Sequence, residues 1–155
     1  MIETIYLDKH HHVVRNKSQA MFRLDIVRNP EEHEDAATKR QWKETAVTVR
    51  QSNFRMCQGG ISTDFFHGDT ADDTSIIFLL YFLARTRSGQ HAALVGFALC
   101  DEEDDDDDDD VDTLYINALC ANPDVRYVPE GGIKGLGSIL LKQIEYFARD
   151  EENYT

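Results

Sequence analysis

The chain has 155 residues, of which 41% are hydrophobic and 10% aromatic, a composition typical of one globular domain. Its formal net charge is −13, but eleven acidic residues lie within residues 101–112, and the net charge without them is only −2. The sequence has no basic stripe typical of nucleic-acid binders. Its most apolar stretch, residues 76–84, is too short for a membrane span of about 20 residues.

The cysteines and the N-terminal sequence indicate the cellular compartment of the protein. Cys57, Cys100 and Cys120 are odd in number and have no CxxC spacing, which favours reduced thiols over a disulfide framework or a zinc site. Residues 1–5 lack the basic start and apolar segment of a signal peptide. We therefore expect a soluble, cytoplasmic protein.

The N-terminal half predicts two strands and a helix. Partial two-residue alternation indicates strands over residues 1–7 and 21–27. Asn29-Pro30 then breaks the chain, and helix-forming residues dominate from 35 to 54, with Trp42, Ala46 and Val49 marking one face.

The central and C-terminal parts predict three more strands and a second helix. Residues 74–86 are expected to form a buried strand, which a turn at 88–90 joins to a partner strand at 91–100. The acidic run at 101–112 is expected to be a disordered, solvated loop, because like charges repel. A strand at 114–121, a Gly-rich loop and an amphipathic helix at 138–149 complete the order. The fold class is mixed α/β or α+β, one domain over residues 1–155 with an antiparallel central hairpin.

A Gly-rich segment between the last strand and the last helix is the strongest chemical signal. It follows Pro123 and reads Gly-Gly-Ile-Lys-Gly-Leu-Gly-Ser over residues 131–138. The free N–H groups and the positive dipole end of a helix start suit phosphate oxygens, and glycine lets a pyrophosphate approach the backbone. The spacing fits neither a P-loop nor a Rossmann GxGxxG fingerprint. A strand-to-helix turn that binds no ligand remains the alternative interpretation.

The segment resembles the acetyl-CoA loop of the GCN5-related N-acetyltransferases, which carry Arg or Gln, two residues, Gly, one residue, and Gly or Ala. The resemblance rests on Gly132, Gly135 and Gly137, on the preceding Leu-x-Ala-x-Pro at 119–123, and on the following Ile-Leu-Leu. It implies an acyl-CoA N-acyltransferase-like fold, with a mostly antiparallel sheet flanked by helices and without the family's C-terminal part.

The resemblance also implies a cofactor and a reaction. The cofactor would be acetyl-CoA, with its pantetheine arm along Leu119, Cys120 and Ala121 in the manner of an added strand. Its pyrophosphate would bind at the loop and helix start, comprising Gly132, Ile133, Lys134, Gly135, Leu136, Gly137 and Ser138. The implied reaction is acetyl transfer to an amine of a small molecule or protein, with a base that takes the ammonium proton.

Besides the absence of the family's C-terminal part, the sequence departs from this family in its loop and at the position of the base. Eleven residues separate Pro123 from Gly135, which leaves the register of the pyrophosphate loop open. The position of the family's Glu base is held by Tyr115, with Asn117 expected on the same face, and neither is a good base at neutral pH. A base elsewhere, relayed through water, and the absence of catalysis both stay open.

Other functions and partners also stay open. The chain would be a catalytically inactive relative that binds CoA or a protein partner, or an interaction protein whose acidic run binds a basic partner. An exposed sheet edge left by the missing closing strands would favour a homodimer. The consecutive residues His10, His11 and His12 are interpreted as exposed linker, because on a strand at most two of them converge on a metal.

Overall fold

The computed structural model describes residues 2–56, 74–104, 112–122 and 135–151. In chain order its elements are β1 (Ile2–Leu7), a 3-10 turn (Lys17–Gln19), β2 (Phe22–Arg28), α1 (Ala36–Met56), β3 (Ile76–Thr86), β4 (Gly89–Asp104), β5 (Asp112–Ala121), α2 (Leu136–Tyr146) and a π-helical turn (Phe147–Glu151).

The described strands form one five-stranded antiparallel sheet in the order β1-β2-β3-β4-β5. Each strand pairs with its neighbour in sequence, and the long β3–β4 hairpin occupies the middle of the sheet. This arrangement confirms the predicted mixed α and β class and the antiparallel central hairpin. Within the described residues β1 and β5 are the two edges, and β5 pairs only with β4.

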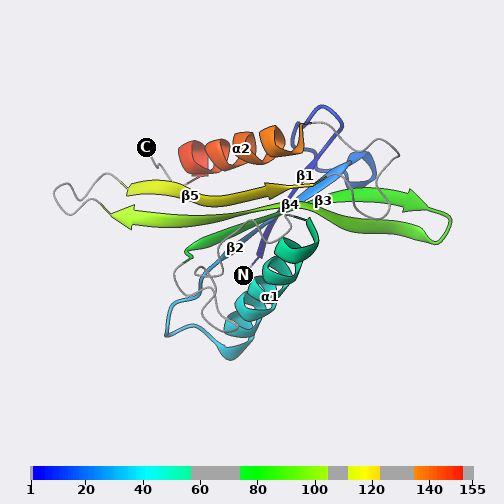
Figure 1. The fold of residues 1–155 in the computed structure, drawn as a ribbon. Coiled ribbons are helices and arrows are strands. Elements are labelled where there is room, and N and C mark those ends of the chain that lie inside the picture. The colour runs from blue at the N-terminus through cyan, green and yellow to red at the C-terminus, as the bar shows by residue number, and fades with distance from the viewer. Residues whose placement is uncertain (1, 57–73, 105–111, 123–134, 152–155) are drawn as a thin grey trace.

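The two helices cover opposite faces of the sheet, with α2 above it and α1 below it in Figure 1. On one face, Ile139, Leu140 and Ile144 of α2 belong to one apolar cluster with residues of β2, β3 and β4. On the other face, Trp42 and Val49 of α1 belong to a second cluster. The sheet is therefore the middle of three layers.

The unbroken apolar run of β3 follows from this layering. Successive side chains of a strand point to opposite faces. Accordingly Ile76 and Phe78 join the cluster under α2, whereas Ile77 and Leu79 join the cluster over α1. All four are 4% exposed or less. Both faces of this strand are buried, which is why it shows no alternation of apolar and polar residues.

Strand β4 extends beyond its expected end at Cys100 to Asp104, inside the acidic run. Its last residues pair with the start of β5, as in the pairs Glu102↔Leu114 and Asp104↔Asp112. The loop expected over residues 101–112 is therefore too long at both ends, because residues 101–104 belong to β4 and Asp112 begins β5. The backbone hydrogen bonds of this pairing outweigh the repulsion between the acidic side chains, and Glu102 also forms an ion pair of 3.4 Å with Arg28 of β2. Residues 105–111 lie outside the described part of the chain.

None of the helices among the described residues is long and apolar enough to cross a membrane.

Candidate functional site

The C-terminal end of β5 and the first turn of α2 lie side by side. A Cβ built on Gly137 would have Cδ2 of Leu119 as its nearest neighbour, at 3.9 Å. One turn further along α2, Leu140 packs on Gly96 of β4, and the carbonyl oxygen of Cys120 lies 3.1 Å from the position of a Gly96 Cβ. The strand end and the helix start that the sequence places in one motif are thus also together in space.

The start of α2 has no side-chain cap among the described residues. Gly135 is the N-cap, in a left-handed conformation (φ 78°, ψ 18°). The first turn itself contains no acidic residue, which favours an anion at its amide groups. The first intrahelical hydrogen bond runs from Ile139 N to Gly135 O over 2.9 Å.

Gly135 and Gly137 would respond differently to the addition of a side chain. Gly135 requires its glycine for conformation, because its φ is positive. Gly137 has ordinary helical geometry, and a Cβ built on it would make an ordinary van der Waals contact of 3.9 Å with Leu119. Of the other expected pyrophosphate residues, Leu136 is buried against the core and Ser138 is exposed. Gly132, Ile133 and Lys134 lie outside the described residues.

The strand residues expected to meet the pantetheine arm all pair with β4, in the pairs Leu119↔Ala98, Cys120↔Phe97 and Ala121↔Gly96. An antiparallel partner on one side uses the inward backbone groups of a strand. A ligand that runs along β5 would meet its outer edge, which no described strand covers.

The cysteines differ from the sequence expectation. Cys120 is disulfide-bonded, and its partner lies outside the described residues. The expectation of only reduced thiols is therefore wrong for Cys120, because spacing along the chain does not report distance across the fold. Disulfides persist in oxidising compartments, so the cysteine count no longer supports a cytoplasmic location. Cys100 is free and buried, and this burial raises the pKa of its thiol to about 12.

A β-bulge lies at the position expected for catalysis. The register of β4 and β5 shifts between Leu99 and Cys100, whose partners are Ala118 and Ile116, so Asn117 has no Cα partner on β4. Asn117 therefore does not follow the simple alternation expected from Tyr115. Both side chains are exposed. Bulges of this kind redirect side chains and are frequent next to active sites.

The bulge brings a carboxylate to this point that sequence reasoning missed. The Asn117 Nδ2 group donates a hydrogen bond to Oδ2 of Asp101, and Asp101 pairs with Tyr115 across the strands. The second carboxylate oxygen of Asp101, Oδ1, is buried and has no hydrogen-bond partner within the described structure. In the sequence Asp101 is the first of ten consecutive acids, and nothing in that run singles it out.

Three kinds of group meet at this point. The Asp101 carboxylate is a proton acceptor, the Asn117 amide is a hydrogen-bond donor that orients it, and the Tyr115 phenol is a weak acid. A buried carboxylate oxygen with a free lone pair is suited to accept a proton. A strand rises about 3.3 Å per residue, so Asn117 lies about 13 Å along β5 from Ala121, and Tyr115 with its partner Asp101 lies about 20 Å from it.

Comparisons of the chain with protein-family models, with curated proteins and with solved structures find no match.

Proposed function

We propose that the protein is a CoA-dependent acyltransferase of the N-acetyltransferase type, which transfers an acetyl group from acetyl-CoA to an amine. The observation that supports this proposal is the proximity of Gly137 to Leu119, with 3.9 Å between Leu119 Cδ2 and a Cβ built on Gly137. This places a helix start without a described side-chain cap beside the end of a strand whose outer edge no described strand covers. A phosphate-bearing cofactor with an extended amide-containing arm requires both features next to each other.

The residues of the chain fit the two ends of such a cofactor. The amide groups at Leu136, Gly137 and Ser138 would hold the pyrophosphate, and the outer edge of β5 from Leu119 to Ala121 would hold the arm. When bound, acetyl-CoA supplies an acetyl group already activated as a thioester.

Asp101 is the proposed general base. Its carboxylate would accept the ammonium proton of the acceptor, while the hydrogen bond from Asn117 to Oδ2 holds it in place. The acceptor is proposed to be an amine because the run of acidic residues that begins at Asp101 attracts cations.

A binding experiment tests the cofactor. Acetyl-CoA at about 100 times its Kd should stabilise the native protein by about 2.7 kcal/mol, which raises Tm. Gly137→Glu should abolish this shift, since a carboxylate would occupy the phosphate position. Leu141→Glu introduces the same charge at an exposed position of the same helix and should leave the shift intact.

A turnover experiment then tests the reaction. Purified protein with acetyl-CoA and spermidine or a lysine-containing peptide should release free CoA. No Tm shift at millimolar acetyl-CoA would refute the proposal as a whole. A Tm shift without turnover of any amine would instead support the non-catalytic CoA-binding protein.

A further inference from the structure

A second cleft lies where the loop between β1 and β2 meets the end of β3. It has a volume of about 470 Å³, within the range of roughly 300–1,000 Å³ of small-molecule sites. None of its lining residues belongs to the proposed cofactor site. They are Asp8, Lys9, His10, Ser18, Gln19, Ala20, Met21, Phe82, Leu83 and Arg85.

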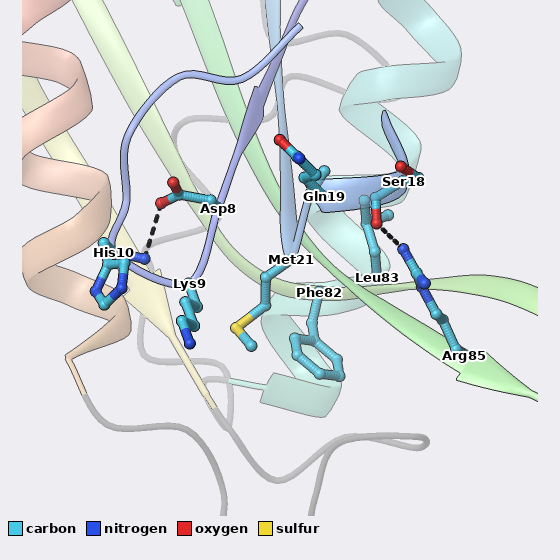
Figure 2. Close-up of a pocket in the computed structure, with 10 residues that line it drawn as sticks. Asp8, Lys9, His10, Ser18, Gln19, Met21, Phe82, Leu83 and Arg85 are labelled. Carbon is cyan, nitrogen blue, oxygen red and sulfur yellow. Dashed lines mark hydrogen bonds between the residues drawn. The ribbon is translucent and has the colours of Figure 1, made fainter. Parts of the chain in front are cut away.

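The floor of the cleft is apolar and packs against the main core. Figure 2 shows Met21 and Phe82 next to each other in its centre. The Phe82 ring packs edge-on against Phe22, with ring centroids 5.9 Å apart, and Phe22 is 1% exposed in the main core. The floor is therefore anchored to the rigid interior of the sheet and offers a fixed apolar surface.

Two cations flank this floor. Lys9 and Arg85 lie on opposite sides of Met21 and Phe82 (Figure 2). Arg85 donates a hydrogen bond from its guanidinium to the Ser18 carbonyl oxygen, which fixes the group while its other N–H donors remain. No described carboxylate forms an ion pair with Lys9 or Arg85.

Asp8 is the one acidic residue in the lining, and its carboxylate accepts hydrogen bonds from the backbone of its own loop. Oδ1 of Asp8 accepts hydrogen bonds from the backbone N–H groups of His10, at 2.8 Å, and His12, at 3.0 Å. With Lys9 and Arg85 the lining has a net charge of +1, in a protein whose net charge is −13. The first residues of the acidic run, 101–104, lie at the other end of β4 from the β3–β4 turn, so the described acidic residues of that run do not neutralise the cleft.

We propose that this cleft binds a small amphipathic carboxylate. The carboxylate would pair with the guanidinium of Arg85, which matches its fork geometry, and the ammonium of Lys9 would add positive charge from the other side of the apolar floor. The hydrocarbon part would lie on Met21 and Phe82. An apolar surface between two cations selects an anion that also has an apolar body, which separates this class from inorganic ions and from neutral lipids.

Three probes of equal chain length test the selectivity. Titration of the full chain with hexanoate, followed by amide NMR, should shift resonances of residues 8–21 and 82–85. Hexanol should bind at least about tenfold more weakly, and hexylamine should leave these resonances unchanged. Equal shifts with hexanoate and hexylamine, or no shift in these segments at millimolar hexanoate, would overturn the proposal.

Two variants test the cations. Arg85→Gln and Lys9→Gln should each weaken hexanoate binding about tenfold, whereas Arg40→Gln, at an exposed position of α1, should have no effect. Lys9 makes no hydrogen bond within the described structure, so Lys9→Gln remains informative if Arg85→Gln disturbs the loop. Unchanged binding by the Lys9 and Arg85 variants would assign the shifts to hydrophobic contact alone and reject the site.

The cleft is independent of the proposed acyl transfer, and one competition separates them. Acetyl-CoA should not displace hexanoate, and Lys9→Gln should keep its Tm shift with acetyl-CoA. Displacement, together with loss of that Tm shift, would assign the two cations to the cofactor and overturn the proposal of a separate carboxylate site.

Discussion

Leu140 of α2 lies directly against Gly96 of β4, so close that a Cβ built on Gly96 would stand 2.9 Å from the Leu140 Cδ1 atom. This contact sets the distance between the helix and the sheet. It thereby positions the first turn of α2 beside the end of β5.

Gly96→Ala should destabilise the protein by about 1–3 kcal/mol, because the added methyl group forces Leu140 and α2 away from the sheet. The carbonyl oxygen of Cys120, at 3.1 Å, restricts the only other direction of relief. Urea unfolding measures the change.

Gly137→Ala is the matched control for this packing. It has 3.9 Å of clearance and lies inside the helix, so the substitution should be neutral or stabilise by up to about 1 kcal/mol. Equal destabilisation by both variants would contradict the close packing at Gly96.

Gly135→Ala should destabilise by about 1–2 kcal/mol for a different reason. The φ of Gly135 is +78°, and no described atom lies within 4 Å of a Cβ at this position, so the expected cost comes from backbone strain. Gly135→Asn should cost less, since asparagine tolerates this conformation better than alanine. Thermal unfolding of the two variants checks the order. Equal Tm values would show that the conformation is not retained.

The features that sequence predicted well are those that local pattern determines. The run at β3 indicates a strand buried on both faces, and the Gly-rich segment indicates the turn into α2. The extension of β4 to Asp104 was not predicted, because it depends on pairing with β5 rather than on the acidic residues themselves.

The arrangement of the candidate catalytic residues could not be predicted from the sequence for the same reason. The bulge at Asn117 arises from the register between two strands, and the pairing of Asp101 with Tyr115 joins residues from both. Neither relationship leaves a pattern in a single stretch of chain. The disulfide of Cys120 was missed for the same reason.

Cys100 predicts a pH dependence of stability. Burial, and then the negative charge of Asp101, raise the pKa of its thiol from 9.0 to about 12. The folded state therefore keeps the thiol neutral where the unfolded state ionises it. The stabilising effect is complete below about pH 9 and is lost as the pH rises towards about 12, at up to about 1.4 kcal/mol per pH unit.

Cys100→Ala should remove this part of the pH dependence. Above about pH 9 its free energy of unfolding should fall less steeply with pH than that of the unsubstituted protein. Urea unfolding at a series of pH values measures both slopes. Parallel slopes would show that the thiol ionises as readily in the native state as in the unfolded chain.

Asp101→Asn tests the proposed base without changing the shape of the site. The asparagine oxygen still accepts the hydrogen bond from Asn117, but it cannot take up a proton at neutral pH. The rate of acetyl transfer to an amine should fall by about 10²–10⁴-fold, while the Tm shift produced by acetyl-CoA stays the same. Glu102→Gln removes a charge from the neighbouring residue, whose side chain points to the other face of β4, and should lower the rate much less. A similar loss in both variants would indicate that the acidic end attracts the amine through its summed charge and that Asp101 has no separate role in proton transfer.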